Sequence, residues 1–165
     1  MQAGPDFQPE SVIRLLGRRR VRYVLIGGLA AVTHGAPLIT QDIDACYARD
    51  EPNLRRLAAA LVEVHAELRG ADPGLPLRLD AETLRAGDAF AVTTDVGWLD
   101  LLGTPAGTAG YEDLTRTADA FDLFGSRVLV ASVEDLIRMK RAAGRPKDLL
   151  ALEELGALRE ELSAG

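Results

Sequence analysis

The apolar positions of the chain alternate between helix-like and strand-like spacings. The clearest helix covers 51–68, where Leu, Val and Ala recur every three or four residues. Further helices are expected over 9–19, 29–34, 81–85, 111–116, 133–143 and 146–162. Ser132 is expected to cap the helix at 133, with Asp135 three residues on, as in a capping box.

Short apolar runs rich in β-branched and aromatic residues predict the strands, over 23–26, 42–47, 89–94, 98–102, 121–124 and 127–130. The last four of these form two hairpins, and 70–76 is a Gly/Pro loop. We therefore expect an α/β (α+β) fold with a mixed sheet of about five strands and helices packed on it. The chain is expected to form a single domain over 1–165, with a helical tail over about 132–162.

Composition narrows the class of protein. The 165 residues are 47% hydrophobic and 27% charged, as in ordinary globular proteins. No apolar run is long enough to span a membrane and no signal-like core begins the chain, so a cytoplasmic protein without a membrane partner is expected. The single cysteine, Cys46, excludes an internal disulfide, and with His34 and His65 it makes no zinc ligand set.

Charge argues mildly against broad binding to a nucleic acid backbone, because the formal net charge is −6. The one dense basic run covers 18–20 and Arg22. It is interpreted as a solvated helix end, and contact with an anionic substrate is the alternative.

The feature that points to chemistry is the pair Asp42 and Asp44 on a largely apolar strand. Residues two apart on a strand share one face, and ionised groups in apolar surroundings need compensation. A divalent cation with oxygen ligands supplies it. The strand over 23–26 ends in Gly27 and Gly28, whose free backbone N–H groups can hold phosphate. Metal and phosphate together suggest a nucleotide.

These residues carry a resemblance to a known family. The sequence IGG, a spacer and DID resembles the signature of the nucleotidyltransferase superfamily, which has the polymerase β-like fold and uses a third carboxylate on a neighbouring strand. Asp100, between Leu99 and Leu101, matches that position. The C-terminal stretch from Glu134 to Leu155 resembles the helical tail of the minimal, AbiEii-type toxin branch. The resemblance covers roughly residues 20–155.

The resemblance implies a site and a reaction. Asp42, Asp44 and Asp100 would be both the catalytic residues and the ligands of two Mg²⁺ ions. The nucleotide would be bound by six further residues: Gly27, Gly28, Thr40, Lys140, Arg145 and Lys147. The acceptor hydroxyl would attack the α-phosphorus of an NTP such as ATP and release pyrophosphate, with Asp100 as a possible general base.

The chain also departs from the family pattern. Many toxin-branch members have Ser where this chain has Gly28, and Arg-x-Thr before the Asp pair, of which only Thr40 is present. Only about 35 residues follow Val130, so no separate C-terminal substrate domain is expected. These departures leave the acceptor more open than the chemistry.

Structural alternatives remain for each of these residues. The two glycines could form only a tight turn, Asp42 could be a turn or strand-edge residue, and Asp44 could pair with an arginine. Asp100 could form a structural ion pair, with Asp95 as its rival for the third ligand. Residues expected to be structural are His34, Cys46 and, with base stacking as the alternative, Trp98; Lys140 could equally be a solvated helix residue.

Three functions follow from this. The first is an NTP-dependent nucleotidyltransferase with a toxin-like role, tRNA or protein as acceptor and a possible antitoxin partner; a small antibiotic is the next acceptor class. The second is a non-catalytic module of the same fold that binds a nucleotide or a partner protein. The third is an interaction protein whose acids form ion pairs. Convergence of the three carboxylates beside Gly28 would separate the first from the third.

Overall fold

A single mixed sheet organises the chain, described here from a computed structural model over residues 6–71 and 78–164. Within these residues the strand order is β3-β4-β5-β2-β1-β7-β6. The strands are β1 (Tyr23–Ile26), β2 (Asp42–Tyr47), β3 (Glu67–Leu68), β4 (Ala89–Thr94), β5 (Gly97–Leu102), β6 (Asp119–Leu123) and β7 (Ser126–Val130). The pairs β2–β5 and β1–β7 are parallel, and the other neighbours are antiparallel. The mixed α/β class is as expected, with seven strands instead of about five.

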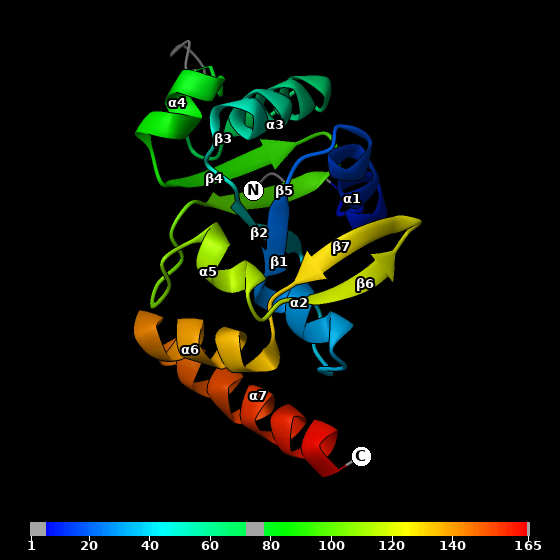
Figure 1. The fold of residues 1–165 in the computed structure, drawn as a ribbon, viewed down its shortest axis with the longest axis vertical. Coiled ribbons are helices and arrows are strands. Elements are labelled where there is room, and N and C mark those ends of the chain that lie inside the picture. The colour runs from blue at the N-terminus through cyan, green and yellow to red at the C-terminus, as the bar shows by residue number, and fades with distance from the viewer. Residues whose placement is uncertain (1–5, 72–77, 165) are drawn as a thin grey trace.

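Helices cover the sheet and extend the molecule along its long axis (Figure 1). They are α1 (Pro9–Arg18), α2 (Gly27–Thr33), α3 (Glu51–Glu63), α4 (Ala81–Ala86), α5 (Tyr111–Thr115), α6 (Val133–Ala143) and α7 (Pro146–Ala164). The C-terminal pair α6 and α7 lies at one end, next to α2, while α3 and α4 lie at the other. Among the described residues, none of these helices has the length and apolar character needed to cross a membrane.

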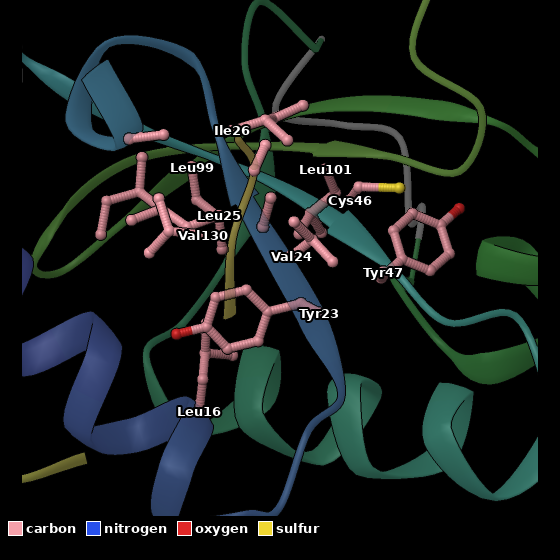
Figure 2. Close-up of a cluster of buried hydrophobic side chains, with 14 of the residues drawn as sticks. Leu16, Tyr23, Val24, Leu25, Ile26, Cys46, Tyr47, Leu99, Leu101 and Val130 are labelled. Atoms are coloured by element: carbon pink, nitrogen blue, oxygen red, sulfur yellow. The ribbon is translucent and has the colours of Figure 1, made fainter. Parts of the chain in front are cut away.

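The core is centred on the two middle strands. Figure 2 shows side chains of β1 and β2 meeting those of β5 and β7 in one cluster, with Leu16 of α1 against Tyr23. All four residues of β1 are buried, which explains why its sequence is continuously apolar and does not alternate. The Cys46 thiol is fully buried and its pKa is raised to about 12 by burial, so it is a packing residue, as expected.

The largest error of the sequence prediction concerns the helix expected over 51–68. Helix α3 ends at Glu63, because His65 adopts a left-handed conformation (φ 51°) and the chain then turns into β3. Leu68 therefore pairs with Val92 of β4 and does not extend the apolar face of the helix. Val62 is 75% exposed, so it also lies off the buried face. A two-residue edge strand has no periodicity of its own, and the helical spacing continued across it by coincidence.

The remaining boundaries agree with the prediction to within a few residues. The clearest shift is that Gly27 and Gly28, expected to precede a helix at 29, form the first turn of α2. Ser132 caps α6 as predicted, its hydroxyl accepting a hydrogen bond from the Asp135 N–H at 3.1 Å. The Asp135 carboxylate does not complete a capping box, because it accepts from Thr117 and pairs with Arg138. Most of the loop expected over 70–76 lies outside the described residues.

Candidate functional site

Three carboxylates converge at the middle of the sheet. Asp42 and Asp44 lie on β2, and Asp100 lies on β5, its parallel neighbour. The pairing register places Asp44 directly opposite Asp100. One ligand oxygen from each of Asp42, Asp44 and Asp100 lies within 4.8 Å of the others. The parallel register thus brings together the three acids that the sequence singled out.

Proximity and burial together make this cluster unfavourable without a cation. Burial, followed by the neighbouring charge of Asp100, raises the pKa of Asp42. Burial, followed by the charges of Asp42 and Asp100, raises the pKa of Asp44 to about 7. One arginine, Arg69, reaches the cluster, with its guanidinium 3.2 Å from Oδ1 of Asp100. Lys147 acts on Asp42 and Lys140 acts on Asp44 without forming an ion pair, and the pKa of both acids is still raised, so the cluster has room for further cationic charge.

The donor set fits a small divalent ion. Carboxylate oxygens are hard ligands of the kind Mg²⁺ prefers, and a pair of ions sharing such ligands is common in phosphoryl-transfer sites. Oδ1 of Asp100 is buried, lies 3.2 Å from the Arg69 guanidinium and accepts no hydrogen bond among the described residues, so the protein does not fully satisfy this carboxylate. The cluster can therefore hold a divalent metal ion through Asp42, Asp44 and Asp100.

The two glycines are required by close contacts at the junction of β1 and α2. Gly27 has φ +71°, and a Cβ on it would meet Asp44, only 2.8 Å from Cγ. A Cβ on Gly28 would lie 3.1 Å from Oγ1 of Thr40. The Thr40 hydroxyl donates to the backbone carbonyl of Asp42 at 3.0 Å, which fixes the start of β2. Gly27, Gly28 and Thr40 therefore lie against the acids, and the glycines are more than a turn between two elements.

The predicted cationic residues come from α6 and the start of α7. Lys140 and Arg145 both pair with Asp148, at 3.3 and 2.8 Å. Asp148 is fully buried and also accepts from the Arg145 backbone N–H at 3.0 Å. Hydrogen bonds from Arg145 hold the pKa of Asp148 well below its usual range. Asp148 was not among the predicted site residues, yet it orients two of the three predicted cations.

A cleft of about 550 Å³ joins these groups. It is lined by the three acids, Gly28, Thr40, the side chains of Lys140, Arg145 and Lys147, and Arg69 with Ala89 and Ala91 of β4. A second pocket of about 340 Å³ adjoins it between α2, α6 and α7 and shares Gly28, Asp44, Lys140 and Arg145 with it. Gly27 lines this second pocket, which is otherwise mostly apolar. All nine predicted site residues therefore line one of two connected pockets.

The structure tests three of the structural alternatives that the sequence left open. Asp95 bonds to His65 at 2.5 Å at the β4–β5 turn and is not part of the acid cluster. His34 bonds to the carbonyl of Ala131 at 2.8 Å, a local structural role as expected. Asp100 forms an ion pair and also belongs to the cluster, so the two interpretations of it are compatible.

Arg69 is the residue that sequence analysis missed. It carries no motif and lies far from Asp100 in the sequence, just after β3. Its guanidinium stacks over the Trp98 ring at 4.4 Å, so one face of this half-buried tryptophan is covered by an arginine.

Asp148→Asn tests the role of the buried aspartate. The amide keeps the shape but not the charge, so Lys140 and Arg145 lose their shared partner. We expect a lower melting temperature at pH 7 and, in the reaction proposed below, an NTP KM raised about tenfold. Because the pKa of Asp148 is depressed in the folded protein, its contribution is present above its unfolded pKa. The difference in melting temperature should therefore shrink in acid, as Asp148 becomes protonated.

The control for this variant is Asp122→Asn, on the exposed β6–β7 hairpin. It removes the same charge without touching the cleft. Equal NTP KM values for the two variants would show that Asp148 does not position the cations.

Comparisons with known proteins agree with the fold. The sequence matches no family model and no curated protein. The structure resembles that of the lincosamide antibiotic adenylyltransferase LnuA in its lincomycin-bound form, with a TM-score of 0.60 and 13% identity over 94% of this chain and 99% of that one. It also resembles the antibiotic-resistance factor ANT(2'')-Ia, with a TM-score of 0.51 and 15% identity over 93% of this chain and 88% of that one. At these identities the likeness establishes a shared fold with such enzymes.

Proposed function

We propose that the protein is a metal-dependent nucleotidyltransferase that moves an NMP group from an NTP to an acceptor hydroxyl. The observation that carries this proposal is the convergence of Asp42, Asp44 and Asp100 within 4.8 Å, in a cleft that is also lined by four cationic side chains. A merely structural set of acids would pair with arginines one by one. Here Asp100 pairs with Arg69, while Asp42 and Asp44 form no ion pair among the described residues.

The acids would hold Mg²⁺ in this reaction. When bound, such ions would neutralise phosphate charge and lower the pKa of an attacking hydroxyl. The chain itself holds the three ligands in place through the β2–β5 register and through the bond from Thr40 to the Asp42 carbonyl. Asp100, on the neighbouring strand β5, would receive the proton of the acceptor hydroxyl.

The donor triphosphate would bind at the side formed by the start of α2 and by α6. Gly27 and Gly28 lie at the start of α2, where backbone N–H groups have no partner within the helix and can bind phosphate oxygens. Lys140 and Arg145, oriented by Asp148, neutralise phosphate charge, and Lys147 adds a third cation. The apolar pocket beside them offers room for the nucleobase. The acceptor oxygen bonds to the α-phosphorus while the bond to the leaving pyrophosphate breaks.

Among acceptors, we favour a small hydroxyl-bearing molecule. The cleft is of small-molecule size at about 550 Å³, and the LnuA chain, named for a lincosamide acceptor, is matched over 99% of its length. A net charge of −6 is a poor match to a polyanionic acceptor. The toxin-like alternative, with tRNA or protein as acceptor and an antitoxin partner, is tested by the same assay.

The assay measures Mg²⁺-dependent transfer of label from each α-labelled NTP to hydroxyl-bearing antibiotics, total tRNA or lysate protein. We expect transfer to one of these classes, lowered about a thousandfold or more in Asp42→Asn because a metal ligand is lost. Asp122→Asn should transfer like wild type. Equal labelling by wild type and Asp42→Asn would exclude the proposed reaction. NTP binding that is indifferent to Mg²⁺ in calorimetry would favour a non-catalytic module instead.

A further inference from the structure

The side chain of Arg69 crosses the edge of the sheet to reach the acid cluster. The residue follows β3, and its backbone N–H donates to the Ala91 carbonyl of β4 at 2.8 Å. Its guanidinium then passes over β4, where it donates to the Val92 carbonyl at 3.1 Å. The opposing residue on β4, Ala91, pairs with Asp100 and has only a methyl side chain, which leaves space for the arginine. The short edge strand β3 thus places the Arg69 guanidinium beside Asp100 of β5.

Three contacts hold the guanidinium in one place. It bonds to the Val92 carbonyl, lies 3.2 Å from Oδ1 of Asp100 and stacks on the Trp98 ring at 4.4 Å. Trp98 and Asp100 are two residues apart on β5, so they present one face to it. The Arg69 side chain is only 30% exposed. A planar guanidinium held by stacking and bonding is far more restrained than a surface arginine.

The position of this cation matters because a carboxylate has two oxygens. Arg69 contacts Oδ1 of Asp100, an atom that accepts no other hydrogen bond in the described residues. A cation fixed on one oxygen sets the rotation of the whole carboxylate and leaves the second oxygen for another ligand. Without Arg69, Asp100 would be free to turn and would repel Asp42 and Asp44 without compensation.

We propose that Arg69, clamped by Trp98, is a positioning residue that fixes the Asp100 carboxylate for metal binding and for contact with the acceptor. This inference rests on the proposed function. Arg69 remains on Asp100 when the metal binds and is not displaced by it. Its role is distinct from that of Lys140, Arg145 and Lys147, which face the donor triphosphate.

The kinetic consequence separates Arg69 from the donor-binding cations. Loss of a group that orients a metal ligand typically costs 10–100-fold in activity or metal affinity. We expect Arg69→Gln to lower kcat by about 10–100-fold with little change in NTP KM, because the donor contacts are untouched. Arg69→Lys, which keeps the charge, should recover part of the loss. Arg127→Gln, on the exposed face of β7, is the matched control and should be unchanged.

A binding readout without nucleotide tests the same point independently of turnover. Calorimetric titration with Mg²⁺ and with Mn²⁺ should show weaker binding to Arg69→Gln than to wild type, by about tenfold. The control Arg127→Gln should bind like wild type. Equal metal affinity of wild type and Arg69→Gln, with equal kcat, would overturn the inference.

Trp98 is the only tryptophan in the chain, so it reports directly on whether Arg69 stays in place. In wild type, acrylamide quenching of its fluorescence should be the same with and without saturating Mg²⁺, whereas Arg69→Gln should be quenched more strongly in both states. A rise in wild-type quenching on metal addition to the level of the variant would show that the metal displaces Arg69, and would overturn the inference.

The two proposals fail in distinguishable ways. If Asp42→Asn loses Mg²⁺ binding and transfer while Arg69→Gln retains both, only the role of Arg69 is wrong. If wild type and Asp42→Asn bind Mg²⁺ equally and neither transfers label, the proposed function itself is wrong, and the inference fails with it.

Discussion

Asp44→Asn is expected to abolish nucleotidyl transfer and, in the metal-free protein, to raise the melting temperature at neutral pH. The two effects have one cause. Asp44 is needed as a metal ligand, but without metal its charge lies close to those of Asp42 and Asp100 in a partly buried site. The amide removes one of the three repelling charges while keeping the size of the side chain. We expect at least a thousandfold loss of transfer and a gain of a few degrees in melting temperature.

The expected difference in melting temperature between wild type and Asp44→Asn depends on pH. The pKa of Asp44 rises from an ordinary value of 3.8 to about 7 in the folded protein, so the folded state holds a proton that the unfolded state has released. Stability of the metal-free wild type should therefore fall as the pH rises from about 4 to 7 and change little above that through this group. The Asp44→Asn variant lacks this contribution, so its advantage should be largest at pH 7–8 and vanish near pH 4.

Thermal melts in EDTA and in Mg²⁺ measure the melting temperatures of the metal-free and the metal-bound protein. Mg²⁺ should stabilise wild type more at pH 8 than at pH 5, because ionised carboxylates bind it and protonated ones do not. It should have much less effect on Asp44→Asn. A variant that melts below wild type at pH 8 in EDTA would contradict the repulsion inferred for the cluster.

Local spacing was enough to predict Asp42 and Asp44 as one site, whereas Asp100 was predicted from the family resemblance. Two acids two apart on β2 must share a face, and an unpartnered charge between Leu99 and Leu101 must have a reason. The parallel β2–β5 pairing could not be derived from spacing, yet it is what sets Asp44 opposite Asp100. The family resemblance supplied only that the third carboxylate lies on a neighbouring strand.

Contacts that depend on three-dimensional neighbours were beyond the sequence. Arg69 reaches Asp100 only because β3 pairs with β4, and β3 itself was hidden inside an apolar pattern of helical period. From the sequence, Asp148 could be assigned only to a helix. Its ion pairs with Arg145 and Lys140 orient both cations, and they become visible only in the structure. Charged side chains with ordinary spacing become informative only when their partners are known. The acceptor is unspecified for the same reason, since its contacts come from side chains on separate elements of the cleft.

Gly27→Ala is the second change for which we expect a large effect, on both stability and the site. The residue has φ +71°, a conformation that costs a residue with a Cβ about 1–2 kcal/mol. The added methyl would also meet the Asp44 side chain, lying 2.8 Å from Cγ and 2.9 Å from Cβ. Because Asp44 is held between β1 and β5, it cannot move away without disturbing the sheet. Forced overpacking of this kind costs about a further 1–3 kcal/mol.

Gly125→Ala is the matched control, because it separates backbone strain from the clash. Gly125 lies in the β6–β7 turn with φ +83°, and a Cβ there would have no neighbour within 4 Å. It should cost only the conformational part, about 1–2 kcal/mol, and leave transfer unchanged. Gly27→Ala should lose about 2–5 kcal/mol of unfolding free energy in denaturant titrations, together with Mg²⁺ binding and transfer. Equal destabilisation by the two variants, with Mg²⁺ binding intact in both, would contradict this prediction. It would show that glycine is required at position 27 only for its backbone conformation, and that Asp44 tolerates a methyl group beside it. The expected difference between them measures how tightly the β1–α2 junction is fitted against the acid that holds the metal.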